Sequence, residues 1–170
     1  RNESNQDDER NFAHATVRRI PAEQLLDSNC AVTETREKFR GLPLGARAVQ
    51  IADGTTSTYF LDAFGRAKRE TVCACEATTA PSLSQALHLL NGSAVHEKIK
   101  QGQVVKKLLD AGQTPEQAIE SLYIRCLARK PTPEEVQKLA SVVQQSDNPQ
   151  VGLDYVMWGV MNSRELLFNH

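Results

Sequence analysis

Residues 114–136 read TPEQAIESLYIRCLARKPTPEEV and contain two helix starts in close succession. At Thr114 and again at Thr132, a capping residue is followed by Pro and, three positions after the cap, by Gln or Glu. The threonine hydroxyl can accept a bond from the third helical N–H, and proline fits the first helical position because its missing N–H would have no partner there. Pro131 should end the first helix because proline cannot continue one. The stretch therefore predicts two consecutive helices.

Apolar residues at helical spacing continue on both sides of this stretch. Downstream, Asn148-Pro149 marks the start of a last helix. Upstream, Asn91-Gly92 and Gly102 separate short apolar segments, because glycine commonly follows the end of a helix. The upstream helical segments predicted in this way are 21–30, 82–90, 93–101 and 104–111.

A long stretch from about Glu34 to Pro81 lacks helical spacing and is interrupted by several glycines. Within it, Asp53-Gly54 favours a tight turn between 47–51 and 55–61. We therefore predict a mainly α fold: a compact bundle of about six or seven helices, with one long irregular loop over 34–81 and at most one small β-hairpin.

The length of 170 residues suits one domain. Residues 1–11 are rich in Asn, Asp and Glu, which predicts a flexible, solvated lead-in, and residues 12–170 are predicted to form a single helical domain. No apolar run approaches the roughly 20 residues that span a bilayer, so no membrane span is expected. Twenty basic residues nearly cancel twenty-one acidic ones, so no global field draws the chain to nucleic acid or to an anionic membrane.

The most reactive residue types gather at Cys73-Ala74-Cys75-Glu76. Two thiols one residue apart could form a disulfide in an oxidising compartment, together or with Cys30 or Cys126. They could instead bind a soft metal with His88 or His14, although structural zinc sites space their paired cysteines by two to four residues. The third interpretation is that two partly buried thiols only fix a loop. No cofactor is predicted.

A second group of candidate site residues contains both basic and acidic side chains. Arg66 and Arg69 lie near Asp62 and Glu76, and guanidinium groups of this kind can bind a phosphate, sulfate or carboxylate. They can equally pair with nearby acids and carbonyls and so fasten an irregular loop, whose backbone groups need partners in any case. The sequence favours the second interpretation.

No residue is predicted to be catalytic. The chain contains no P-loop, no Gly-x-Gly-x-x-Gly, no His-Glu-x-x-His and no Cys-x-x-Cys-His. The last absence means that this chain does not attach haem in the usual c-type manner.

Several segments together resemble one family. They are 18–27 (RRIPAEQLLD), 59–66 (YFLDAFGR), 73–76 (CACE), 83–92 (LSQALHLLNG), 122–135 and the ending 158–170 (WGVMNSRELLFNH). Over about residues 12–170 the chain resembles the C-terminal PSD domain, a domain of unknown function in large exported proteins of planctomycetes and their relatives. It departs from the family pattern at Ala67, where Pro is usual, and at Ala77, where Arg commonly follows the Cys-x-Cys-Glu motif.

The resemblance implies which domains accompany this chain and where the protein is located, but it implies no specific chemistry. Family members often carry a c-type cytochrome-like domain and another uncharacterised domain upstream. The resemblance therefore implies an exported, periplasmic or cell-surface protein whose upstream domains, or a separate protein, are the partners of this chain. We expect a non-catalytic structural or interaction module, with a redox or metal-binding module centred on Cys73 and Cys75 as the alternative.

Overall fold

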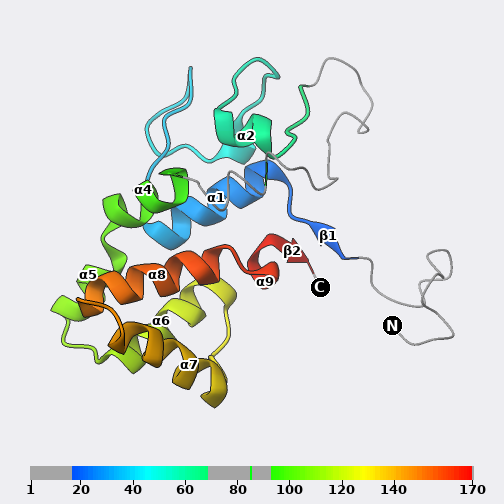
Figure 1. Ribbon diagram of the computed structural model, residues 1–170. Helices are drawn as coiled ribbons and strands as arrows, with labels where there is room; N and C mark the ends of the chain where they lie inside the picture. The colour runs from blue at the N-terminus through cyan, green and yellow to red at the C-terminus, as the bar shows by residue number, and fades with distance from the viewer. Residues whose placement is uncertain (1–16, 69–84, 86–92, 170) are drawn as a thin grey trace, which may run out of the picture.

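The computed structural model describes residues 17–68, 85 and 93–169. The protein is mainly α-helical in these residues, as predicted, with two short strands (Figure 1). The elements are β1 Arg18–Arg19, α1 Ala22–Thr33, the 3₁₀ helix η1 Ala48–Gln50, α2 Tyr59–Ala63, α4 Ser93–Gly102, α5 Val104–Asp110, α6 Pro115–Leu127, α7 Pro133–Gln144, α8 Pro149–Met161, α9 Arg164–Leu167 and β2 Phe168–Asn169.

The two helix starts of residues 114–136 form as the sequence predicts. Thr114 accepts a hydrogen bond from the Gln117 N–H, and the Gln117 side chain accepts one from the Thr114 N–H at 3.0 Å. Thr132 and Glu135 make the same reciprocal pair at the start of α7, with 2.7 Å from the Thr132 N–H to the Glu135 carboxylate. These local bonds fix where α6 and α7 begin.

A first hydrophobic core lies in the lower part of Figure 1, where α6, α7 and α8 pack against one another. The helices α4 and α5 contact α8 as well, so α8 lies centrally in this bundle. The side chains that fill the centre are fully or almost fully buried: Val105, Ile119, Leu122, Leu153, Met157 and Met161.

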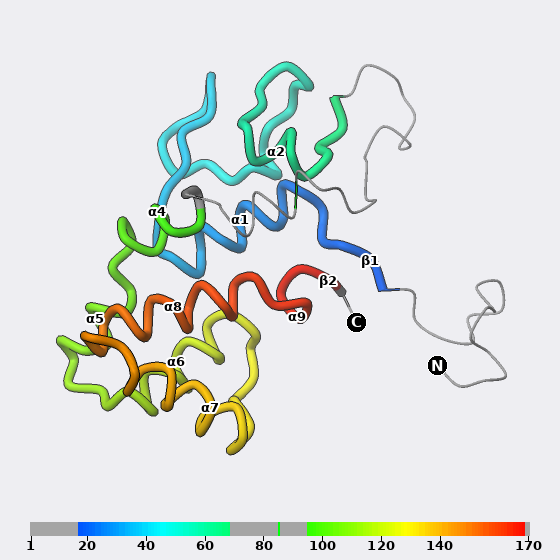
Figure 2. The backbone as a smooth tube through the Cα atoms, viewed as in Figure 1, coloured from blue at the N-terminus to red at the C-terminus, as the bar shows by residue number. Residues whose placement is uncertain are grey.

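A second hydrophobic core joins α1 to η1, α2 and the irregular segments between them. Phe60 and Phe64 stack with ring centroids 4.4 Å apart. Its buried side chains are Ala22, Leu25, Leu26, Phe39, Ala48, Ile51, Phe60, Leu61, Phe64 and Leu167. This core holds the described part of the long irregular segment against α1, in the upper part of Figure 2.

The two cores meet at the C-terminal end of α1. The carboxylate of Glu34 pairs with Lys107 at 2.6 Å and with Arg125 at 2.8 Å, and Arg125 also donates to the Val32 carbonyl at 3.2 Å. These contacts tie α1 to α5 and α6.

The two strands also bring the ends of the described chain together. β1 pairs antiparallel with β2, with Arg18 opposite Asn169 and Arg19 opposite Phe168. The Ile20 N–H then donates to the Leu167 carbonyl at 2.9 Å. The first and last described segments therefore lie side by side.

The prediction of a small β-hairpin at Asp53-Gly54 is wrong. Residues on either side of this turn form η1 and α2 instead of strands. The Asp53 carboxylate accepts bonds from the Thr56 N–H and hydroxyl, and Thr58 then caps α2 by accepting from the Leu61 N–H at 3.3 Å. Hydrogen bonds from backbone N–H groups to the side chains of Asp53 and Thr58 thus take the place of the backbone hydrogen bonds that would pair the two strands of a hairpin.

Of the predicted helix over 82–90, the structure describes only Gln85, which is helical. The expected lead-in over 1–11 lies outside the described residues. No helix in the described part of the chain is long and apolar enough to cross a bilayer.

Gly102 provides a test of the junction between the two cores. A Cβ on Gly102 would overlap the carbonyl oxygen of Thr33, a backbone atom that cannot move aside on its own. We expect Gly102→Ala to destabilise the protein by about 3 kcal/mol in urea unfolding, because overpacking at a fixed contact forces the backbone to shift.

Gly159, inside α8, is the matched control. A Cβ there meets no atom within 4 Å, and the position is helical. Gly159→Ala should therefore be stabilising by about 0.5–1 kcal/mol. Equal effects of the two substitutions would show that the α1–α4 contact is not tight.

Candidate functional site: an apolar groove on the helical bundle

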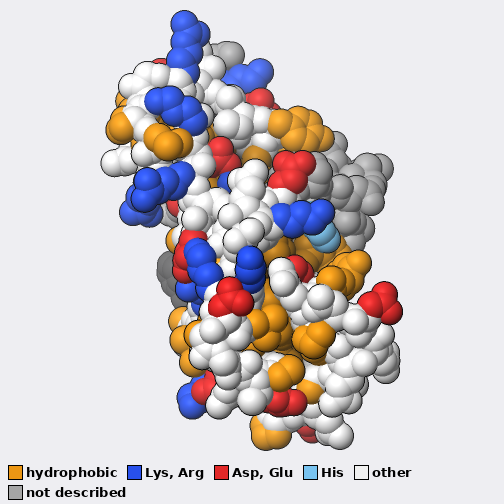
Figure 3. Space-filling model, turned by 90° about the vertical axis from the view of Figure 1, so that its left-hand side faces the viewer, with side chains coloured by type: hydrophobic (Ala, Val, Ile, Leu, Met, Phe, Trp, Pro, Cys, Tyr) orange, Lys and Arg blue, Asp and Glu red, His pale blue; other side chains and the backbone are white. Residues whose placement is uncertain are grey.

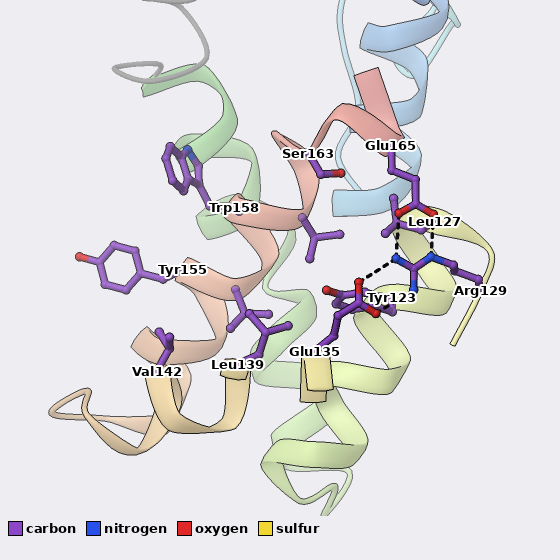
Figure 4. A pocket seen from close by; sticks show the side chains of 13 residues that line it. Tyr123, Leu127, Arg129, Glu135, Leu139, Val142, Tyr155, Trp158, Ser163 and Glu165 are labelled. Carbon is purple, nitrogen blue, oxygen red and sulfur yellow. Dashed lines mark hydrogen bonds and ion pairs between the residues drawn. The ribbon is translucent and has the colours of Figure 1, made fainter. Parts of the chain in front are cut away.

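A groove of about 430 Å³ opens on the surface of the bundle, between the end of α6, α7, α8 and the start of α9 (Figure 4). Its side chains are predominantly apolar and aromatic, with charged groups at one end. The apolar and aromatic lining residues include Tyr123, Leu139, Val142, Tyr155 and Trp158. We call this feature the apolar groove.

The packing of α7 against α8 explains why the groove is open. Near the turn between them, a Cβ on Gly152 would lie 2.8 Å from the Cα of Val143, so the two helices touch there. Further along α8, Gly159 lines the groove and has no neighbouring atom where its Cβ would be. The two helices are thus in close contact at Gly152, whereas at Gly159 no side chain fills the space between them, and a hollow remains there.

Large apolar side chains on the walls of the groove remain exposed. Tyr155 is 55% exposed and Val142 is 43% exposed, and Trp158 is half-buried. In Figure 4, the side chains of Tyr155 and Trp158 extend outward from α8. His96 of α4 lies against both rings, with its centroid 6.4 Å from Tyr155 and 5.8 Å from Trp158.

Arg129 closes the other end of the groove as part of an ion cluster. Its guanidinium makes two bonds to Glu135 at 2.9 Å each, and two to Glu165 at 2.6 and 2.8 Å. It also lies over the ring of Tyr123, 5.2 Å from the centroid. The cluster ties the α6–α7 turn to α7 and α9.

The ion cluster shifts the protonation of its members. Hydrogen bonds from Arg129, followed by the bond from the Thr132 N–H, lower the pKa of Glu135 from its ordinary 4.5 to about 2. The bonds to Glu135 and Glu165 raise the pKa of Arg129 in turn. Glu135 and Arg129 therefore carry their charges at neutral pH, and the formal charges of the three side chains sum to −1.

The charged groups at the end of the groove are engaged with one another. Burial raises the pKa of the Tyr123 hydroxyl, which keeps that group protonated. Bidentate bonds hold these charged groups in place. What remains open to a ligand is the apolar and aromatic surface.

Of the predicted anion-binding or loop-fastening residues, the structure describes Arg66 and Asp62. The Arg66 side chain is only 2% exposed and pairs with Glu23 of α1 at 3.1 Å. It also donates to the carbonyls of Thr56, Ile51 and Asp53. Arg66 thus ties the segment after α2 to α1 and to the turn before α2.

Asp62 lies apart from the bonds of Arg66 and accepts from the Ser57 hydroxyl at 2.6 Å. The other predicted site residues lie outside the described residues: Cys73, Cys75, His88, Arg69 and Glu76. Their disulfide, metal and loop-fixing interpretations stay predictions. Within 17–68, 85 and 93–169, no three His, Cys, Asp or Glu side chains group to hold a metal ion.

Both described cysteines are free thiols. Cys126 lies in the core of the bundle, where burial raises its pKa to about 11. Cys30 is half-buried and lies 3.4 Å from the ammonium group of Lys98. Burial raises its pKa, and Lys98 opposes that shift.

The groove was not found from the sequence. Val142 fits the apolar spacing of α7 and would be expected to face the core, whereas it lines the groove. The one available signal is that α8 carries more apolar residues than a single buried face requires. Arg129 and Glu165 are 36 positions apart, and only the folded chain shows that they meet.

The ion cluster gives a prediction for acid pH. Because the pKa of Glu135 is about 2 when folded and 4.5 ordinarily, its charge stabilises the fold above about pH 4.5 and loses this effect as pH falls toward 2. Glu135→Gln should therefore be less stable than the unmodified protein at pH 7, and this difference should shrink between pH 4.5 and 2.

The measurement is urea unfolding across that pH range. The matched control is Glu134→Gln, an exposed neighbour in the first turn of α7. Its effect should be smaller at pH 7. A pH-independent difference for Glu135→Gln would mean that the cluster does not stabilise the fold through charge.

Thiol mapping provides a second prediction. With alkylation in native buffer followed by peptide mass spectrometry, Cys126 should react much more slowly than Cys30, because it is buried and few of its thiols ionise. After unfolding, the two should react alike. The same maps report whether Cys73 and Cys75 are blocked until reduction, which a disulfide requires. Fast native alkylation of Cys126 would contradict its place in the core.

Comparison with known proteins gives one match. The family model of a protein of unknown function (PSD1, DUF1553) matches residues 1–143, which include α1, α2 and α4–α6 and nearly all of α7. The match starts before the residue 12 expected from the resemblance and ends before α8, which forms one wall of the groove. No curated protein and no solved structure matches the chain. Since the match covers most of its length, the chain belongs to the PSD1 (DUF1553) family of proteins of unknown function.

Proposed function

We propose that this chain is a non-catalytic interaction module of a larger exported, cytochrome-associated protein, and that the apolar groove is its contact surface. The observation that carries the proposal is the exposure of Tyr155 and Val142 along a hollow that already contains Trp158. Aromatic side chains beside a recess are typical of the centres of protein interfaces.

The chemistry of the groove supports an apolar occupant. Leaving Tyr155 and Val142 in water forgoes the free energy that their burial would provide. The carboxylates of Glu135 and Glu165 are already bonded to Arg129, so an occupant need not neutralise them one by one. The cluster still carries a formal charge of −1, which favours a basic residue at that end of the occupant.

We propose that the occupant is an apolar segment with such a basic residue, supplied by the part of the same polypeptide that precedes this chain. Attachment to the same chain gives a weak contact a high effective concentration, so a groove of this size would be sufficient. The upstream cytochrome-like domain and the exported location rest on the resemblance to the PSD domain.

The redox or metal-binding alternative, centred on Cys73 and Cys75, stays a prediction because both residues lie outside the described part of the chain. The thiol mapping above addresses its disulfide form.

A photo-crosslinking experiment in the purified full-length polypeptide tests the groove. Benzoylphenylalanine placed at Tyr155 should crosslink to a segment that precedes residue 1, and mass spectrometry should identify an apolar peptide with a basic residue. The matched control is the same label at Ile124, which is 48% exposed on α6 and does not line the groove.

Three outcomes would contradict the proposal. Crosslinks from the two positions to the same peptides would indicate random contact. Crosslinks only to a second copy would make the groove a self-association surface. The absence of crosslinks from position 155 would leave the groove unoccupied.

A further inference from the structure

A second surface lies on the other core, at the segment that joins α1 to η1. Residues 36–47 of this segment, which we call the basic loop, project from the helical body in Figures 1 and 2. The loop is held from within, because the Gly45 N–H donates to the Glu37 carbonyl at 2.9 Å and the Leu42 N–H to the Phe39 carbonyl at 3.2 Å. The side chain of Phe39 is buried in the core and anchors the loop.

The exposed charges of the basic loop are predominantly positive. Arg36, Lys38 and Arg40 are exposed, and among the described residues no carboxylate pairs with any of them. Figure 3 shows Lys and Arg side chains gathered with hydrophobic ones at the upper end of the molecule.

Each nearby acid is already matched by another cation. Glu37 pairs with Lys98, and Asp27 pairs with Arg47 at 3.5 Å. Glu34 lies just before the loop and pairs with the cations of α5 and α6 described above. The three unmatched cations therefore give this end of the molecule a local positive charge, although the whole chain carries −1.

Apolar side chains are exposed beside these cations. Leu44 of the basic loop is 63% exposed, and Val49, just after it, is 43% exposed. Neither side chain lines the recess of about 400 Å³ at the base of the loop, which Arg36, Gly45 and Arg47 border. Both side chains are placed to enter another surface.

We propose that the basic loop binds an anionic lipid surface, with Leu44 entering the interface and Arg36, Lys38 and Arg40 lying against the headgroups. An apolar side chain and a group of cations are the two signals that together hold a protein at a membrane surface. A projecting loop suits a soft, flat surface, whereas an acidic protein would need a recess shaped to receive Leu44. This inference does not depend on the proposed function of the groove.

The position of the loop leaves the apolar groove free. In Figure 1 the basic loop lies on the α1 side of the molecule and α7 at the opposite end. The groove is lined by residues of α7 and α8 and therefore lies away from the loop. A chain held at a membrane by the loop would present the groove away from the lipid. Both surfaces could therefore act at once, and each can be tested alone.

Vesicle binding by the purified 170-residue chain tests the inference. We expect the chain to sediment with vesicles that contain phosphatidylglycerol and not with phosphatidylcholine alone. Because each cation near such a surface contributes about 1 kcal/mol, Arg40→Gln should lower the partition coefficient about fivefold. Raising the salt to about 0.5 M should weaken binding as well, since it shortens the screening length.

Two matched substitutions serve as controls. Lys106→Gln removes one exposed positive charge from α5, and Ile124→Ser removes one exposed apolar side chain from α6. Neither should change binding, whereas Leu44→Ser should lower the partition coefficient about tenfold because the inserted side chain is lost. In addition, the fluorescence of Leu44→Trp should shift to shorter wavelength on anionic vesicles, and the unmodified protein, with Trp158 alone, should not show this shift.

Other results would overturn the inference. Equal losses with Arg40→Gln and Lys106→Gln would mean that the loop has no special part in binding. Binding to polyglutamate without binding to any vesicle would make the loop a contact for an acidic protein. A vesicle interaction that does not depend on anionic lipid would remove the proposed role of the cations.

Discussion

The end of α1 is the place on which the rest of the structure depends. There Gly102 of α4 lies directly against the Thr33 carbonyl, and the fully buried Thr33 hydroxyl donates to the Asn29 carbonyl at 2.7 Å. One residue later, the backbone of Glu34 turns into the left-handed region, with a φ of 57°, and its carboxylate faces Lys107 and Arg125. Within two residues, Thr33 and Glu34, the chain contacts α4, ends helix α1 and forms ion pairs with α5 and α6. Both hydrophobic cores are positioned relative to each other by this junction.

Away from the junction, buried and half-buried charged groups connect segments that are distant in the chain. Arg66 ties the segment after α2 to Glu23 of α1, and Arg129 ties the α6–α7 turn to Glu165. Both guanidinium groups use several donors at once, which arginine can do because its donors lie in a fixed plane. Their polar groups are therefore largely used in holding the fold, whereas the apolar groove and the basic loop are open to other molecules.

The parts of this structure that the sequence predicts are those set by neighbours a few residues apart. The caps at Thr114 and Thr132 depend on residues three positions away, and α6 and α7 begin where those caps predict. The hairpin failed for the same physical reason, because Asp53 and Thr58 bond to nearby backbone groups and thereby favour a turn and a short helix. Glu23 lies 43 positions from Arg66 and Glu165 lies 36 positions from Arg129, distances that no local pattern reaches. The groove was beyond prediction as well, because it arises from the spacing of two helices.

The pairing of β1 with β2 determines how the molecule would respond to tension. The chain enters and leaves the described fold at one point, where only Arg18–Asn169 and Arg19–Phe168 face each other across the ladder. A pull applied through the two ends would load this short pair first and would pass from there to the second core, because Arg19 donates to the Phe64 carbonyl and Leu167 is buried in that core. Tension would therefore reach α1 and α2 before it reached the bundle of α6, α7 and α8, whose helices pack mainly on one another.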